Sequence, residues 1–425
     1  MTGLHPVASP ASPHDLVAAV VADLEPELIA LRRDLHAHPE PSWAEHRTTA
    51  VLRDRLLRAG LAAVVGPTGT GVVCDITSSS GRHRRGGSAA PAPVEGGPIV
   101  VIRGDIDALC MPDTKDVAYR STVDGVCHAC GHDLHAAATV GAALAVAATL
   151  EATGIAGTVR VILQPAEEAI PGGASALVAA GVLDGVQAAF GLHADPARDV
   201  GAVGISAGPV TSAADHLEIT LRGPGGHTGR PHQTADLVHI ASRVVVDLPM
   251  GLGRLLDSRD GLNLTFGSIN AGLAANVIPT EARVCGSLRA SGRGAWDAAP
   301  DLLPKLLAAI VEPLGATWEL DHERGAPPIV NDAWAVEQVV AAAGAVVGAG
   351  SVGATPQSAG GEDFSWYGDV APLGYLRLGV HRPGTDRVDL HAGSFDLDES
   401  AIALGARILA GTALEALGDL AARPT

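Results

Sequence analysis

Basic residues and long apolar runs are both scarce in this chain of 425 residues, and each shortage excludes a class of protein. Lysine and arginine number 29 against 47 acidic residues, which gives a formal net charge of −18. Proteins that bind nucleic acid or anionic membrane surfaces need a basic footprint, and this composition lacks one. The most apolar stretch, "TVGAALAVAATL" at 139–150, is too short to span a bilayer.

Cysteine is also scarce, with five residues in the whole chain. An odd number of cysteines in so long a chain argues against a disulfide framework. The first residues, "MTGLHPVASPASPHDL", contain no basic region followed by an apolar run, so no signal peptide is expected. These observations together predict a cytoplasmic enzyme.

Strand-like and helical stretches alternate between residues 98 and 194, which predicts an α/β fold with a mixed sheet and flanking helices. From about residue 214 the pattern changes to strands with alternating polarity, typical of a smaller α+β unit, and from about residue 325 the α/β pattern returns. The predicted organisation is a disordered tail (1–13), a larger catalytic domain in two parts (14–210 and 325–425) and an inserted smaller domain (211–324). The Gly/Pro-rich residues 78–98 are expected to form a long mobile hairpin loop between the strands "GVVCDI" and "PIVVIRGDID".

Side chains that can bind metal or transfer protons follow the predicted strands of the larger domain. Ligands of α/β sheets bind outside the carboxyl ends of the strands. The candidates at these ends are Asp105, Asp107, Glu167, Glu168 and His193. The run "DGVCHACGHDLHAAA" at 124–138 adds Cys130 and His132 at the start of a predicted helix, and His391 follows much later in "VDLHAGSF". Cysteine, histidine and glutamate form a mixed donor set that suits Zn²⁺, Mn²⁺, Co²⁺ or Ni²⁺.

Several simpler interpretations compete with a metal site. Cys127 and Cys130 form a C-x-x-C pair, which can be a redox motif in a cytosolic protein. A structural zinc site needs four protein ligands, and the sequence has no second cysteine pair of this kind. A lone histidine in an apolar run, such as His135, is more often a satisfied core residue. Glu167 and Glu168 could be a solvated surface pair.

A catalytic dimetal site explains more of these residues than the alternatives do. Two adjacent carboxylates at a buried strand end are costly to desolvate unless a cation lies beside them. One carboxylate can then bind metal while the other accepts a proton from water. Five protein donors are too many for one open catalytic zinc but suit two metals that share a bridging water.

The sequence resembles the dinuclear metal-dependent aminoacylase and carboxypeptidase superfamily, in its amidohydrolase branch of hippurate hydrolases, N-acyl-amino-acid amidohydrolases and auxin-conjugate hydrolases. The resemblance covers roughly residues 25–415. Its motifs occur in this order: "LRRDLHAHPEPSWAE", "RGDIDAL", "CHACGHDLHAA", "QPAEE", "GLHA", "GGHTGRPH", "NVIPTEA", "GGEDFSWY" and "LHAGSFDLDE". Two departures are Met-Pro-Asp-Thr at 111–114, where relatives usually have a glutamate, and Gly229, where alanine is commoner.

The resemblance implies specific roles for individual residues. The implied metal ligands are Cys130, His132, Glu168, His193 and His391. Glu167 would be the general base, and Asp107 would orient a ligand, with Asp105 a weaker candidate for that role. His227 would stabilise the oxyanion in a partner subunit's site, because the inserted domain forms the homodimer in relatives. The implied substrate residues are Asn276, Arg289, Gly361 and Glu362.

The predicted activity is hydrolysis of the amide bond of N-acyl or N-aroyl amino acids by two divalent metal ions per subunit. The alternative is a metallo-dipeptidase or aminopeptidase on the same scaffold, which would need a group that holds a free α-amine. The expected hinges of the inserted domain are "GPVTS" (208–212) and "ERGAPP" (323–328).

Overall fold

The computed structural model describes residues 12–78 and 97–423, and the chain divides into two compact units. Unit 1 comprises Met1–Gly208, Asn331–Pro356 and Trp366–Thr425, and unit 2 comprises Pro209–Val330 and Gln357–Ser365. The second segment of unit 2 carries Gly361 and Glu362, which the sequence had placed in the larger domain. Of the predicted tail and the predicted loop, residues 1–11 and 79–96 lie outside the described residues.

Unit 1 is built on a mixed β-sheet whose main strands follow the order β1-β2-β4-β3-β5-β16. These strands are β1 (Val64–Val65), β2 (Val72–Thr77), β3 (Ile99–Asp105), β4 (Thr158–Gln164), β5 (Ala188–Asp199) and β16 (Leu373–His381), and the short strands β6 (Val203–Gly204), β7 (Gly208–Pro209), β14 (Val330–Asn331) and β15 (Val352–Gly353) complete the sheet. All residues of β3 and β4 are buried, as expected for central parallel strands. The predicted hairpin is wrong, because β4 lies between β2 and β3.

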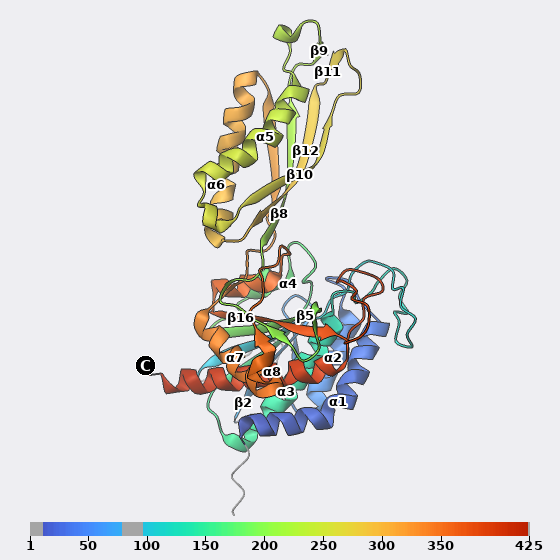
Figure 1. The fold of residues 1–425 in the computed structure, drawn as a ribbon, viewed down its shortest axis with the longest axis vertical. Coiled ribbons are helices and arrows are strands. Elements are labelled where there is room, and N and C mark those ends of the chain that lie inside the picture. The colour runs from blue at the N-terminus through green and yellow to red at the C-terminus, as the bar shows by residue number, and fades with distance from the viewer. Residues whose placement is uncertain (1–11, 79–96, 424–425) are drawn as a thin grey trace, which may run out of the picture. The chain divides into compact units, whose positions relative to one another are not determined.

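The long helices of unit 1 pack together and against this sheet (Figure 1). They are α1 (Pro13–Ala37), α2 (His46–Arg58), α3 (His132–Thr153), α7 (Ala333–Val347) and α8 (Ser400–Ala422), with a short α4 (Gly173–Ala179). Helix α3 contacts both α1 and α8, and it is apolar around most of its circumference, as a central helix must be. Its first residue is His132, which brings a predicted donor to the edge of the sheet.

Helices α3 and α8 are long and apolar enough to cross a membrane by length and composition. The apolar segment at 139–150 lies within α3. In each helix 72% of the most apolar window is buried inside the protein, and core helices pass the same test. Burial in unit 1 accounts for their apolar character.

Unit 2 is an antiparallel four-stranded sheet with two helices packed against it. Its elements are β8 (Ala213–Arg222), β9 (Gly226–His227), α5 (Leu237–Leu255), β10 (Asn263–Ala271), β11 (Val277–Ile278), β12 (Glu281–Ala290), α6 (Arg293–Val311) and β13 (Thr317–Glu323). The sheet order is β10-β12-β8-β13, and β9 pairs with β11 in a separate ribbon. The alternating burial in β8 and β13 is typical of a sheet with one covered face.

Candidate metal centre

The predicted donors of unit 1 gather at the carboxyl-terminal edge of its sheet. Cys130 and His132 lie at the start of α3, Glu168 follows β4, and His193 lies in β5. His391 lies in the segment before α8, where its backbone N–H donates to the Ala129 carbonyl at 2.8 Å. Residues that are far apart in sequence thus meet because parallel strands end at one edge.

The donor atoms form two overlapping groups that share the Cys130 sulfur. In one group, the ligand atoms of Cys130, His132 and His193 lie within 4.8 Å of one another. In the other, those of Cys130, Glu168 and His391 do. The His391 Nε2 is 3.2 Å from Glu168 Oε1, and this contact raises the pKa of His391. Two donor groups with one shared thiolate can hold two cations side by side.

Hydrogen bonds prepare two histidines to bind a cation through Nε2. His132 Nδ1 is 2.9 Å from the Asp107 carbonyl oxygen and 3.2 Å from Asp107 Oδ1, so Nδ1 is the protonated nitrogen. His193 Nδ1 similarly donates to the Ala194 carbonyl at 2.7 Å, and its Nε2 is 3.5 Å from Cys130 Sγ. When Nδ1 carries the proton, the Nε2 lone pair faces the cluster, as in metal-ligating histidines.

The surroundings of these donors favour positive charge. His132 Nε2 is buried and has no hydrogen-bond partner among the described residues. Burial lowers the pKa of His132, but charge interactions, of which the one with Asp105 is the largest, outweigh burial and raise that pKa well above the usual range. Burial raises the pKa of the Cys130 thiol to about 12, so the thiol keeps its proton unless a dication displaces it. The donor set and its electrostatics therefore fit two divalent metal ions.

Glu167 and Glu168 do not end a strand, which corrects the sequence interpretation. Strand β4 ends at Gln164, and a turn through Ala166 with a left-handed φ of 53° carries both glutamates. The Glu168 backbone N–H donates to Asp107 Oδ2 at 3.0 Å, and Glu167 Oε2 lies 3.8 Å from His132 Nε2. One carboxylate oxygen of each glutamate lies within 4.8 Å of the other and of a His132 ring nitrogen, so the turn, not strand alternation, brings both carboxylates to the cluster.

His135 is a buried and fully hydrogen-bonded core residue, as the sequence predicted, and its two hydrogen bonds also support the site. His135 Nδ1 donates to Asp105 Oδ1 at 2.6 Å, and His135 Nε2 accepts the Ala194 N–H at 2.8 Å. Asp105 also accepts from Arg103 Nη1 at 2.5 Å. This buried chain holds the strand next to His193. The three-residue spacing between His132 and His135 was the sequence signal for this supporting role, since residues three apart share a helix face.

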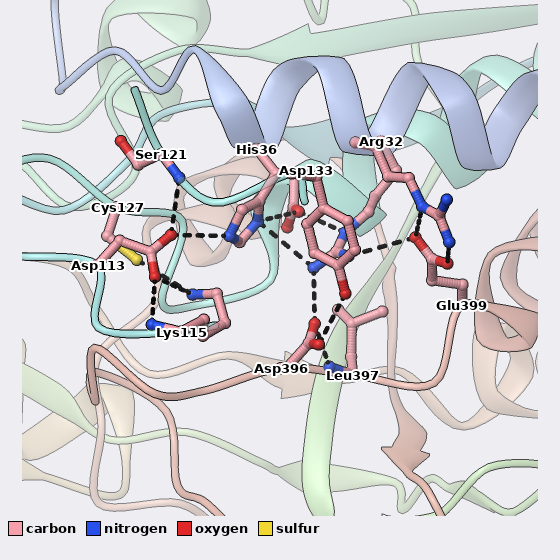
Figure 2. Close-up of polar contacts among 12 residues, drawn as sticks. Arg32, His36, Asp113, Lys115, Ser121, Cys127, Asp133, Asp396, Leu397 and Glu399 are labelled. Carbon is pink, nitrogen blue, oxygen red and sulfur yellow. Dashed lines mark hydrogen bonds and ion pairs between the residues drawn. The ribbon is translucent and has the colours of Figure 1, made fainter. Parts of the chain in front are cut away.

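A second buried network joins α1 to Asp133 at the start of α3 (Figure 2). Arg32 of α1 donates from Nε to Asp133 Oδ2 at 2.6 Å and from Nη2 to Asp396 Oδ1 at 3.2 Å. His36 Nδ1 lies 2.7 Å from Asp133 Oδ2. Since Asp133 follows His132 and Asp396 comes five residues after His391, this network joins both donor-bearing segments to α1.

The same network contains a third group of candidate donors, made up of His36, Asp113 and Cys127. The Lys115 ammonium already lies in this group, 3.0 Å from Asp113 Oδ1 and 3.5 Å from Cys127 Sγ (Figure 2). The Lys115 ammonium thus occupies the position that a metal ion would need. All five cysteines are free thiols, including Cys127 and Cys130 of the C-x-x-C pair.

Unit 2 carries the remaining predicted residues at its two ends. His227 of β9 pairs with Val277 of β11, and Asn276 directly precedes that strand. The Gly229 N–H donates to His227 Nδ1 at 2.9 Å, which leaves Nε2–H as a donor. A side chain at Gly229 would lie 3.1 Å from that nitrogen, so glycine suits this close contact.

Arg289 lies near the other end of β12, where its Nη1 donates to the Ala359 carbonyl at 3.3 Å. Gly361 belongs to the same end, because a Cβ there would lie 3.2 Å from the Ala214 side chain, and Ala214 pairs with Arg289. Glu362 is buried, and its Oε1 accepts the Phe364 N–H at 3.0 Å. The structure therefore groups Arg289 with Gly361 and Glu362 but separates it from Asn276.

Comparison with known proteins places this site in a family. N-acetylcysteine deacetylase of Bacillus subtilis is 35% identical to the chain, over 91% of the chain and 96% of the relative. N-acyl-L-amino acid amidohydrolase of Geobacillus stearothermophilus is 33% identical, over 74% of the chain and 80% of the relative. A Rhodococcus jostii protein named as a glutamate–cysteine ligase is 40% identical over 91% of the chain, but the chain spans only 46% of its length.

A solved structure agrees with the sequence relatives. The crystal structure of a Bacillus subtilis protein, described as a dinuclear metal binding peptidase, matches with a TM-score of 0.76 and 31% identity, over 93% of this chain and 99% of that one. The predicted mixed α/β fold and the predicted family are both confirmed. Residues 101–415 match Peptidase family M20/M25/M40, and the chain belongs to this family of dinuclear metal hydrolases.

Proposed function

We propose that the protein hydrolyses the amide bond of N-acyl or N-aroyl amino acids, releasing a carboxylic acid and a free amino acid. The observation that carries this proposal is the pair of donor groups that share Cys130, with the Glu167 carboxylate beside them. Its relatives include a deacetylase of N-acetylcysteine and an amidohydrolase of N-acyl amino acids, which supports this substrate class over dipeptides.

The proposed metal ligands are Cys130, His132, Glu168, His193 and His391. When bound, two dications would polarise the scissile carbonyl and lower the pKa of water. A shared thiolate favours Zn²⁺, although Mn²⁺, Co²⁺ and Ni²⁺ also suit a mixed sulfur, nitrogen and oxygen set. Asp107 holds the His132 ring through Nδ1 and the Glu168 backbone through its other oxygen, so it would keep two ligands in place.

Glu167 is the proposed general base. Its carboxylate would take a proton from the attacking water and deliver it to the leaving amine, which contributes ~10²–10⁴-fold to such reactions. His227 would donate from Nε2–H to the developing oxyanion, since its Nδ1 already accepts a hydrogen bond. Arg289 would bind the free carboxylate of the amino acid.

We also propose that the active protein is a homodimer formed through unit 2. Arg222 pairs with Glu281 at one end of β12 and Ala214 pairs with Arg289 at the other, so His227 and Arg289 are separated by about eight residues of strand. Eight strand residues span roughly 26 Å. One copy therefore cannot bring both side chains to the same small substrate, and a second copy would supply His227.

Unit 2 also has an apolar surface that suits a second copy. Val238, Val246 and Met250 are 47%, 64% and 58% exposed, and their spacing of four or eight residues places them on one face of α5. Helix α5 packs beside β10, an edge strand whose Ile269 is 50% exposed. Exposed apolar side chains next to an open strand edge are typical of an interface.

The test is turnover of benzoyl- and acetyl-amino acids, with dipeptides as the alternative substrates. We expect Glu167→Gln to lower kcat by at least about 100-fold while two metals per chain remain, measured by inductively coupled plasma mass spectrometry. Glu151→Gln, at the exposed end of α3, is the control and should change neither value. Retention of most activity in Glu167→Gln, or preference for dipeptides, would contradict the proposal.

A further inference from the structure

The turn that carries Glu167 is held at three backbone groups. The Ala166 N–H donates to Glu45 Oε1 at 2.8 Å, and the Glu168 N–H donates to Asp107 Oδ2 at 3.0 Å. The Ala166 carbonyl accepts the Gly173 N–H at 2.9 Å. The N–H groups of the residues before and after Glu167 therefore both donate to buried carboxylates from other parts of the chain.

Glu45 is one of the two carboxylates that bind this turn. It is buried, yet it does not cap the N-terminus of its own helix. It stands at the N-cap position of α2, where its side chain makes no capping hydrogen bond. Its Oε1 instead accepts two backbone N–H groups, from Ala166 and from Trp43 at 3.0 Å. Burial, with the nearby Asp107 charge, raises the pKa of Glu45.

Both residues whose amides Glu45 binds have left-handed backbones. The φ angle is 53° at Ala166 and 66° at Trp43, and neither residue is glycine. Such conformations persist only where the surrounding structure holds them, and they concentrate at functional sites. Without an acceptor for its N–H, Ala166 would relax toward an ordinary conformation and rotate the peptide that leads into Glu167.

We propose that Glu45 is a positioning residue, which holds the Ala166 turn so that the Glu167 carboxylate stays aimed at the metal centre. The inference rests on the proposed role of Glu167 as general base. A displacement of about 1 Å in a catalytic group can cost ~100-fold in rate. Since Glu45 touches neither substrate nor the proposed ligands, its loss should lower kcat more than it changes KM.

The chain offers a matched control in Glu40, five residues before Glu45. The Glu40 carboxylate also accepts two backbone N–H groups, from Arg47 at 3.0 Å and Thr48 at 2.8 Å. Those amides belong to the first turn of α2 and not to the segment that carries Glu167. Glu40→Ala and Glu45→Ala thus remove the same kind of interaction, but only the second releases the Ala166 turn.

The experiment compares kcat, KM, metal content and melting temperature of Glu45→Ala, Glu45→Gln and Glu40→Ala. We expect Glu45→Ala to lower kcat about 10- to 100-fold per metal-loaded enzyme, with KM changed less than about threefold. Glu45→Gln should restore kcat to within about threefold of wild type, because its amide oxygen can accept both N–H groups. Glu40→Ala should lower the melting temperature but leave kcat unchanged.

Three outcomes would overturn the inference, and they can be told apart from failure of the proposed function. If Glu45→Ala keeps its kcat while Glu167→Gln is inactive, Glu45 does not position the base. If Glu45→Ala and Glu40→Ala lose kcat equally, Glu45 does not act specifically through the Ala166 turn. If Glu45→Gln is as impaired as Glu45→Ala, acceptance of the two N–H groups does not explain the role of Glu45. A fully active Glu167→Gln would overturn the proposed function and the inference together.

Discussion

Replacing Arg32 by methionine should destabilise unit 1 more than an ordinary arginine substitution would. The Arg32 side chain is 1% exposed, and its guanidinium lies 2.6 Å from Asp133, 3.2 Å from Asp396 and 3.4 Å from Glu399 (Figure 2). Burial opposes ionisation of Asp133, but Arg32 and His36 outweigh it and hold the pKa of Asp133 well below its usual range. The substitution keeps most of the aliphatic packing and removes the charge.

The magnitude follows from the burial of each partner. Asp133 is fully buried, and breaking a buried ion pair costs about 3–5 kcal/mol because the remaining charge is left uncompensated. The other two carboxylates are 28% and 14% exposed, so they add about 0–1 kcal/mol each. These contributions total about 3–7 kcal/mol, and at about 2 °C per kcal/mol for a domain of this size the melting temperature should fall by roughly 6–14 °C.

Scanning calorimetry in the presence of a chelator measures this loss without a contribution from bound metal. Arg33→Met is the matched control, because Arg33 is 50% exposed and its pairing with Glu399 should be worth at most about 1 kcal/mol. Adding Asp133→Asn to Arg32→Met should recover at least about 2 kcal/mol of unfolding free energy, since it removes the buried Asp133 charge that has lost its Arg32 partner. A shift below 2 °C for Arg32→Met, or no recovery in the double variant, would refute the reasoning.

Four further measurements address other parts of the molecule. Cys130→Ala should lose at least one of two metals per chain by mass spectrometry, because both donor groups contain this sulfur, and unchanged metal content would contradict the assignment. Burial opposes ionisation of Asp113, but two backbone amides and Lys115 lower its pKa to about 2. Its stabilising effect is therefore complete above about pH 5 and lost as pH falls toward 2, so the melting-temperature gap between wild type and Asp113→Asn should close over that range. Val246→Asp should shift the protein from dimer to monomer in light scattering and lower activity, whereas a fully active monomer would exclude a contribution from the partner. Arg289→Ala should raise KM for N-acyl amino acids but not for their carboxamides, and equal effects on both would exclude carboxylate binding.

The sequence predicted the elements of the fold more fully than their arrangement. Buried apolar runs such as 98–107 and helical spacing in 132–152 marked the strands and helices of unit 1 to within a few residues. The partner of β2 could not be read in this way, because periodicity reports which face of a strand is buried and not which strand lies beside it. Strand β2 pairs with β4, a partner more than eighty residues away, and not with the next strand along the chain.

At the site, the donor types were predictable and the backbone geometry was not. Cysteine, histidine and glutamate at strand ends indicated a metal centre, but alanine and tryptophan give no sign of a left-handed φ, which non-glycine residues rarely adopt. The link between His135 and Asp105 depends on how α3 packs on β3, which is a tertiary fact. The dimer and the cytoplasmic location stay predictions.

The motif "LRRDLHAHPEPSWAE" shows why a family motif can supply no metal donor and still belong to the site. Arg32 and His36 bind Asp133, next to His132. Ser42 donates to Asp107, which holds His132 and Glu168.

Glu45 of the same motif binds the turn before Glu167. One stretch of fifteen residues therefore touches each of the segments that carry His132, Glu167 and Glu168, through hydrogen bonds to buried groups. Since metal geometry depends on distances between these segments, loss of the Glu45 carboxylate should lower kcat before it unfolds the protein. Through these contacts, the motif fixes the positions of the segments that carry His132, Glu167 and Glu168 relative to one another.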